Sequence, residues 1–182
     1  MMKKIFLIVA LITIFMSFVL TNNAIAYTAK QIDTDVDATL NLFEEVKGSN
    51  TVLESAKGLL VFPSVIKAGF GIGGEYGEGA LRIKGETAGY YSTVAASIGF
   101  QIGAQKKSII IAFMQKGALD KFRNSSGWKI GADASIAVIA IGAGGSIDTA
   151  THNEPIIAFV FDQKGLMYNL TLEGAKITEI KK

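Results

Sequence analysis

The sequence predicts an α+β domain in which N-terminal helices pack on a curved, mainly antiparallel, glycine-rich β-sheet, barrel-like if its edges approach each other. Apolar residues first recur at intervals of three and four, which indicates helices; from Gly58 onwards they mostly alternate, which indicates strands. Helices followed by a run of strands are typical of an α+β domain. Several strands also carry glycine, alanine or serine along one face, which favours bends and close packing.

Residues 1–26 have the pattern of a secretory signal. Two lysines form a basic start, residues 5–20 an apolar core, and Ala24-Ile25-Ala26 a small-residue cleavage site. The apolar core is slightly shorter than the roughly 18 residues expected of a membrane-spanning helix, so we expect cleavage before Tyr27 rather than an uncleaved anchor. We therefore predict an exported protein, periplasmic or secreted and peripheral to the membrane, with residues 27–182 as one domain. The chain has no cysteine, which excludes disulfides and lipid attachment at a cysteine.

The charge balance depends on that leader. It holds two of the 18 basic residues and none of the 16 acidic ones, so the remainder has 16 of each and gives no case for nucleic-acid binding. The charges are unevenly distributed, since the charged residues of segment 27–47 are mostly acidic and those of segment 106–129 are mostly basic. This asymmetry predicts an orientation on an anionic surface, although solvated loops also carry such lysines. The basic residues of the second segment are Lys106, Lys107, Lys116, Lys121, Arg123 and Lys129.

Two helices are expected before the strands. Residues 28–47 carry apolar side chains at intervals of three and four, with Gly48 as a stop. The polar face of this helix is acidic, so we expect it to pack on its own sheet rather than on a membrane. Ser49 or Asn50 can cap a second, short helix over residues 51–56.

The remaining segments predict about eight strands and one short helix. A buried strand over residues 59–62 ends at Pro63, and two strands flank a hairpin turn at Gly77-Glu78-Gly79. The later elements, in order, are strands over residues 90–105 and 108–114, a helix over 116–123, a long strand over 128–142, strands over 155–161 and 166–172, and a last edge strand from Ile177.

The segment from Gly69 to Gly79 has an apolar face and a bare one. Its odd positions are mostly glycine, and its even positions carry Phe70, Ile72 and Tyr76. Glycine weakens a strand unless something approaches the backbone closely, so the bare face needs an occupant. An elongated apolar ligand and the helix over residues 28–47 both fit this requirement.

Residue types for catalysis are sparse. The glycines at 69, 71 and 74 fit a dinucleotide fingerprint by letter, but no helix opens after them. His152 is the only histidine and no cysteine is present, so we predict no metal site. A Ser–His–Asp arrangement using His152 and Asp148 lacks a serine in a nucleophile-elbow context. We therefore predict no catalytic residues, no cofactor and no enzymatic activity.

An ordered set of motifs covers nearly all of the chain from the first helix to Gly174. These motifs are Ala56-Lys57-Gly58-Leu59-Leu60-Val61-Phe62-Pro63, Lys67-Ala68-Gly69-Phe70-Gly71-Ile72-Gly73-Gly74, Gly77-Glu78-Gly79, Gly99-Phe100-Gln101-Ile102-Gly103-Ala104-Gln105, Gly131-Ala132-Asp133-Ala134-Ser135, and Gly165-Leu166 with Leu172-Glu173-Gly174. In this order they resemble a SYLF domain. Where many members of that family carry Trp-Ser-x-Pro, this chain has Tyr91-Ser92-Thr93-Val94, which departs from the pattern.

The resemblance implies phospholipid binding, and in eukaryotic members also actin binding. We do not expect actin as a partner of an exported chain. The leading hypothesis is a non-enzymatic, exported protein that binds an anionic phospholipid or membrane surface, with the six basic residues of segment 106–129 as head-group contacts worth about 1 kcal/mol each. The alternative is a structural protein of the cell envelope that binds another protein through its sheet.

Overall fold

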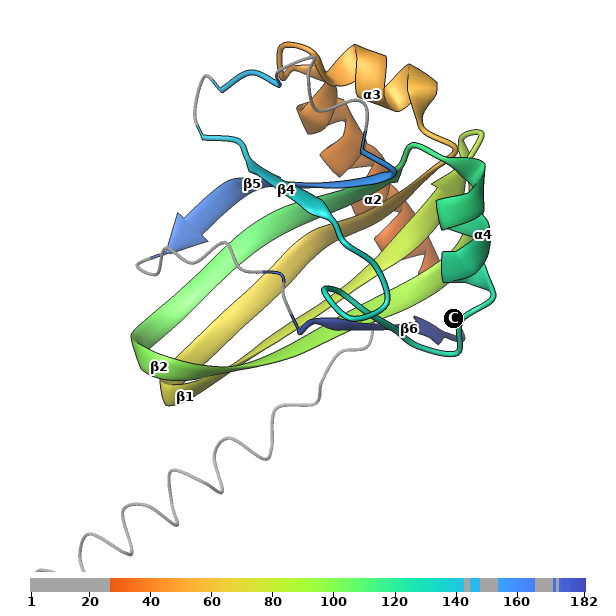
Figure 1. The fold of residues 1–182 in the computed structure, drawn as a ribbon. Helices are drawn as coiled ribbons and strands as arrows, with labels where there is room; N and C mark the ends of the chain where they lie inside the picture. The colour runs from red at the N-terminus through yellow and green to blue at the C-terminus, as the bar shows by residue number, and fades with distance from the viewer. Residues whose placement is uncertain (1–26, 143–144, 148–153, 166–171, 173) are drawn as a thin grey trace, which may run out of the picture.

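The computed structural model describes residues 27–142, 145–147, 154–165, 172 and 174–182. In this part of the chain, three helices and one six-stranded sheet are present (Figure 1). The helices are α2 (Ala29–Glu44), α3 (Ser49–Ser55) and α4 (Lys116–Arg123). The strands are β1 (Gly58–Ile83), β2 (Glu86–Phe113), β3 (Trp128–Lys129), β4 (Ala137–Ala140), β5 (Ile156–Gly165) and β6 (Lys176–Ile180). The predicted α+β class, with N-terminal helices on a curved and mainly antiparallel sheet, is confirmed.

Strands β1 and β2 form one long antiparallel hairpin that organises the sheet. Gly58 pairs with Phe113 at its open end and Ile83 with Glu86 next to its turn. Strand β5 is antiparallel to the second part of β2, and β4 is parallel to β5. Strand β6 is antiparallel to the first part of β2 and also pairs with β3. The long hairpin therefore carries one group of strands on each of its halves.

The hairpin bends sharply near its middle, where both strands turn at the lower left of Figure 1. Its register shifts between Phe70 and Ile72, and a Cβ atom built on Gly69 would lie 2.5 Å from the Cα atom of Gly73. A register shift of this kind increases local twist and bends the strand. The bend turns the hairpin back on itself and curls the sheet.

Glycine allows the two halves of β1 to meet. A Cβ atom on Gly79 would overlap the carbonyl oxygen of Val61, and one on Gly77 would lie 2.8 Å from the carbonyl oxygen of Ser64. The bare face expected from the sequence is therefore occupied by the first part of the same strand. The expectation that an N-terminal helix or a ligand fills it is wrong for this part of β1.

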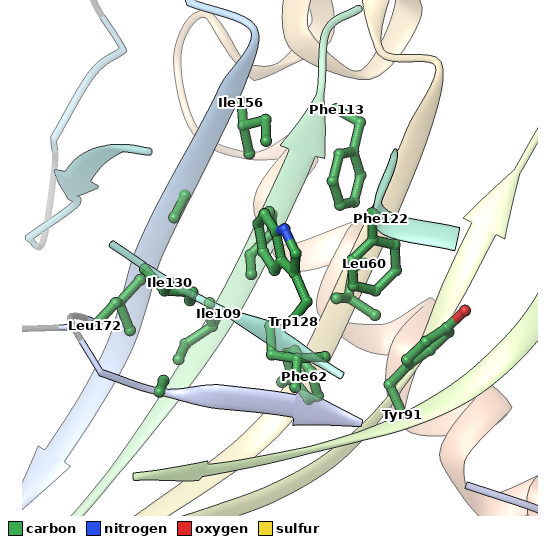
Figure 2. Close-up of a cluster of buried hydrophobic side chains, with 14 of the residues drawn as sticks. Leu60, Phe62, Tyr91, Ile109, Phe113, Phe122, Trp128, Ile130, Ile156 and Leu172 are labelled. Carbon is green, nitrogen blue, oxygen red and sulfur yellow. The ribbon is translucent and has the colours of Figure 1, made fainter. Parts of the chain in front are cut away.

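Two hydrophobic clusters lie on opposite faces of the sheet. Inside the curl, α4 and β3 cover an aromatic cluster in which the rings of Phe122 and Trp128 lie 5.3 Å apart, edge to face (Figure 2). On the other face, α2 buries Ile32, Val36 and Phe43 against residues such as Ala80. Helix α2 thus covers part of the apolar face of β1 with its own apolar stripe, as its spacing of three and four requires.

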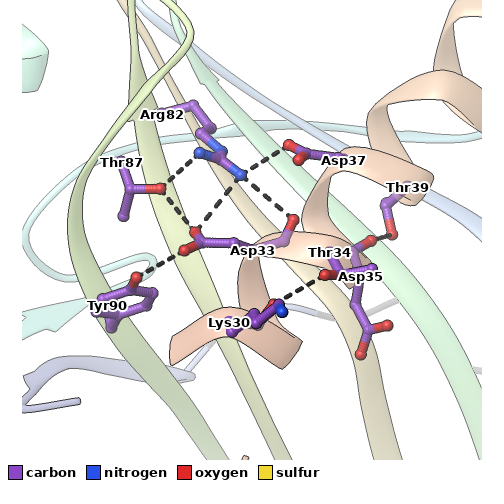
Figure 3. A network of polar contacts seen from close by, with 9 residues as sticks. All are labelled: Lys30, Asp33, Thr34, Asp35, Asp37, Thr39, Arg82, Thr87 and Tyr90. Carbon is purple, nitrogen blue, oxygen red and sulfur yellow. Dashed lines mark hydrogen bonds and ion pairs between the residues drawn. The ribbon is translucent and has the colours of Figure 1, made fainter. Parts of the chain in front are cut away.

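A polar network fixes α2 to the hairpin near its turn (Figure 3). The Arg82 guanidinium lies 2.7 Å from a carboxylate oxygen of Asp37 and 3.4 Å from one of Asp33. Thr87 and Tyr90, on β2, each donate a hydrogen bond to Asp33. One helix carboxylate thus joins both strands of the hairpin, which sets the position of α2 along the sheet.

Several local expectations differ from the structure. Helix α4 has the expected bounds, and α2 and α3 lie close to theirs, although α3 begins after Gly48 without a side-chain cap. The expected turn at residues 77–79 lies inside β1, and the chain turns at Lys84 and Gly85, both with positive φ. Strand β1 also continues through Pro63, and the expected long strand over residues 128–142 is two short strands joined by a turn. The strand expected over residues 166–172 lies almost entirely outside the described residues.

We expect Gly79→Ala to destabilise the domain by about 3 kcal/mol or more, because the methyl group has to displace backbone rather than a flexible side chain. Gly117→Ala is the matched control, since no atom lies within 4 Å of that position and it lies in helix α4. Alanine there is expected to leave stability unchanged or raise it by up to ~1 kcal/mol. Urea unfolding of both variants tests this, and equal stabilities would contradict it.

Candidate functional site

An exposed apolar surface lies at the bend of the hairpin. Four large side chains on it are half exposed or more: Ile66 at 55 %, Ile72 at 74 %, Tyr76 at 52 % and Val94 at 50 %. Single exposed apolar residues are normal on a soluble domain, but a group of them on one surface marks a binding site. We call this surface the hairpin face; its large side chains are joined by the small exposed residues Ala68, Gly74, Ala96 and Ala104.

Strand pairing connects the hairpin face across β1 and β2 on each side of the bend. Tyr76 pairs with Val94, Gly74 with Ala96 and Ala68 with Ala104 across the two strands. Further along the same face, at Ala80, helix α2 covers the sheet and the side chain is buried. The apolar positions found by alternation in the sequence are therefore core residues under α2 and surface residues at the bend.

Two lysines border the hairpin face. Lys106 pairs with Ile66 on β1 and, on its other side, with Lys164 on β5. Both side chains are exposed, and Lys164 lies 3.1 Å from the carboxylate of Asp162. The edge of the apolar surface thus carries two positive charges, and Asp162 partly neutralises the one on Lys164.

Tyr76 is held in place from its polar end. Its hydroxyl donates a 2.6 Å hydrogen bond to Glu78, and the ammonium group of Lys182 lies 2.7 Å from the other carboxylate oxygen. Burial and the contact with Glu78 raise the pKa of Tyr76 to about 12. Burial alone would raise the pKa of Glu78, but the hydrogen bonds from Lys182 and Tyr76 outweigh it and hold that pKa below its usual value.

Directly behind the hairpin face, inside the curl, lies a group of buried charges. The ammonium groups of Lys67 and Lys107 lie 3.2 Å and 2.9 Å from the two carboxylate oxygens of Glu75. Exposed fractions are 2 % for Lys67, 0 % for Lys107 and 8 % for Glu75, and Gln105 beside them is 2 % exposed. We call Lys67, Glu75 and Lys107 the charged cluster.

The six basic residues expected as head-group contacts do not share one surface. Lys106 borders the hairpin face, whereas Lys107, the next residue on the same strand, points inward and is fully buried. Helix α4 lies away from the bend in Figure 1, and Lys129 is exposed on β3. The three basic residues of α4 are exposed, and they are Lys116, which pairs with Asp120, Lys121 and Arg123.

Sequence reasoning missed the charged cluster and most of the hairpin face. The signal was present in the alternation, because Lys67 and Glu75 occupy the odd positions that carry the glycines, and so share their inward face. The composition of segment 106–129 led us to group Lys106 with Lys107. In a strand, however, the side chains of successive residues point to opposite faces of the sheet.

Other candidate chemistry finds little support. His152 and Asp148 lie outside the described residues. Within the described part of the chain, no group of three or more histidine or acidic residues gathers closely enough to hold a metal ion. None of the described helices is long and apolar enough to cross a bilayer. A hollow of about 450 Å³ is lined by Val46, by residues 140–142 at the end of β4, and by Phe161, Asp162 and Gln163 of β5.

The family model for Ysc84, described as a Las17-binding protein and actin regulator, matches residues 94–182. The chain belongs to the Ysc84, or SYLF, family. It is 27 % identical over 135 residues to SH3 domain-containing YSC84-like protein 1 of Pongo abelii, covering 71 % of this chain and 39 % of the relative. It is 30 % identical over 138 residues to SH3 domain-containing protein PJ696.02 of Schizosaccharomyces pombe, covering 71 % of this chain and 31 % of the relative.

This Ysc84-family chain thus spans only 39 % and 31 % of the length of these two relatives. The matched residues 94–182 include the later part of β2 and all strands that follow it. Most of the hairpin face lies on β1, before that match. The family description names binding to another protein and no reaction.

Acid is expected to remove the stabilisation that Glu78 provides. A carboxylate whose pKa is lowered on folding stabilises the native state above its ordinary pKa, and this contribution is lost as the pH falls through the native pKa. The stability difference between the native protein and Glu78→Gln should therefore be constant near neutral pH and shrink as the pH falls below the ordinary glutamate value of 4.5. Urea unfolding across this range measures it, and a difference that grows on acidification would contradict it.

Proposed function

We propose that this Ysc84-family chain is a non-enzymatic, peripheral phospholipid-binding protein that contacts anionic membranes through the hairpin face. The observation that carries the proposal is the group of exposed apolar side chains at the bend, bordered by Lys106 and Lys164. A surface of this composition fits a bilayer interface, where acyl chains receive apolar groups and head groups receive cations.

The apolar side chains supply the larger part of the expected affinity. Fully burying a side chain such as Ile72 is worth roughly 1.5–3 kcal/mol, and each lysine near an anionic surface adds about 1 kcal/mol. Tyr76 suits the level of the head groups, since its ring is apolar and its hydroxyl polar. Together, these free energies are sufficient for reversible membrane binding without a spanning helix or a covalent lipid.

Protein binding is the second candidate function. Both relatives carry an SH3 domain in their names, and the family description names a Las17-binding protein. An exposed sheet face also fits a protein partner of complementary shape. The lysines beside the hairpin face favour an anionic membrane over this alternative, and the vesicle experiment below separates the two.

Export is a separate part of the proposal, supported by the basic start, apolar core and Ala24-Ile25-Ala26 site of the leader. We expect the protein recovered from its native host to begin at Tyr27 and to lie outside the cytoplasm. Terminal sequencing of the protein from envelope and medium fractions measures this. An intact leader on a protein of the cytoplasmic fraction would contradict it.

The membrane proposal predicts that Ile72→Glu weakens binding to vesicles about tenfold or more, because an apolar contact is replaced by a charge repelled from anionic lipid. Leu42→Glu is the matched control, since Leu42 is 49 % exposed on α2, outside the hairpin face. Co-sedimentation with vesicles of phosphatidylcholine and phosphatidylglycerol measures both. Absence of binding by the native protein, or equal losses in both variants, would contradict the proposal.

The same assay tests the contribution of individual lysines to membrane binding. Lys106→Glu should weaken binding to anionic vesicles while leaving the weaker binding to pure phosphatidylcholine unchanged. Lys121→Glu on α4 tests the head-group role expected from the sequence, because that lysine lies away from the bend. A loss equal to that of Lys106→Glu would place α4 at the membrane as well.

A further inference from the structure

The charged cluster contains more positive than negative charge. Lys67 and Lys107 share the single carboxylate of Glu75, and all three side chains are more than nine-tenths buried. Buried charges in proteins are normally matched, because an unmatched ion away from water is costly. Among the described residues around this group, one positive charge has no counterpart.

Two polar atoms of the same region also lack partners. The Nζ atom of Lys107 lies 2.9 Å from Glu75, but the direction of this contact does not make it a hydrogen bond, and no described atom accepts one from it. The buried Oε1 atom of Gln105 likewise has no donor, while its amide nitrogen lies 3.5 Å from Gln163. Buried polar groups are almost always satisfied, so each exception needs an explanation.

We propose that the charged cluster is a site for a phosphate group, either inorganic phosphate or the phosphate of a phospholipid. A phosphate oxygen beside Lys107 supplies both the missing negative charge and the missing acceptor, and a protonated phosphate oxygen can donate to Gln105. Lysine is a common phosphate ligand in proteins. The lipid form of this proposal rests on the proposed membrane binding, whereas the inorganic form stands without it.

The position of the site suggests how phosphate enters. Lys67 and Glu75 lie on either side of the bend in β1, where the register shifts and the strand is rich in glycine. The cluster occupies the inner side of the same strand segments whose outer side is the hairpin face. Uptake therefore requires the bend to open, and we expect slow, saturable binding.

The test adds inorganic phosphate to the whole domain, residues 27–182, and measures binding at equilibrium by dialysis. The native protein should bind phosphate saturably, and Lys107→Met should weaken this binding about tenfold or more, as expected for loss of a hydrogen bond to a charged group. Lys121→Met, at an exposed position of α4, is the matched control and should bind like the native protein. Binding that is absent, or equal in both variants, would overturn the proposal for inorganic phosphate.

Glu75→Gln keeps the proposal testable if Lys107→Met folds poorly. This variant leaves two buried cations without their carboxylate, so it should be less stable than the native protein and gain more thermal stability from added phosphate. A smaller gain than that of the native protein would overturn the proposal.

A separate competition experiment tests whether a phospholipid supplies the phosphate. Vesicles of phosphatidic acid in phosphatidylcholine should compete with inorganic phosphate for the native protein, whereas pure phosphatidylcholine should not. Ile72→Glu should abolish this competition and leave the binding of inorganic phosphate intact, so failure of membrane binding and failure of the phosphate site are distinguishable. Competition that persists in Lys107→Met would overturn the assignment of the lipid phosphate to the charged cluster.

Discussion

The packing of β1 against itself determines the rest of the structure. The backbone of residues 61 and 64 approaches Gly79 and Gly77 so closely that any side chain there would collide with it. The contact requires the hairpin to bend, and the bend curls the sheet and closes an interior that α4 and β3 fill. The face opposite the glycines is then turned outward. Helix α2 covers only part of it, which leaves the hairpin face open to solvent.

The sequence was sufficient to predict the helices and the two different faces of β1. It was not sufficient to predict which of these faces points into the core. Spacing of three and four identified α2 and α4 because burial of one stripe is a local requirement. Gly77-Glu78-Gly79 fits a turn by composition, yet its glycines serve a contact with residues some 15 positions away. Local patterns cannot distinguish these uses, because turns and close backbone approaches require the same residue.

The hairpin face and the charged cluster were missed for one shared reason. Hydropathy assigns Ile66 and Ile72 to the interior and Lys67 and Lys107 to the surface, and at the bend the structure has the opposite arrangement. The register of the strand explains how this is possible, because a slip by one residue exchanges its two faces. Only the glycines at odd positions allow the two halves of β1 to approach closely. These glycines therefore determine which face of β1 lies inside.

Stability alone does not account for this arrangement. Exposed isoleucine forgoes the gain of burial, and two buried lysines with one carboxylate carry a desolvation cost that an apolar core would avoid. Local rules are broken mainly where a protein has a function that needs it. Here both violations lie on opposite faces of the same short segments of β1 and β2. A lipid that contacts the outer face with its chains and offers phosphate to the inner one would satisfy both, and this shared position argues that they belong to one binding site.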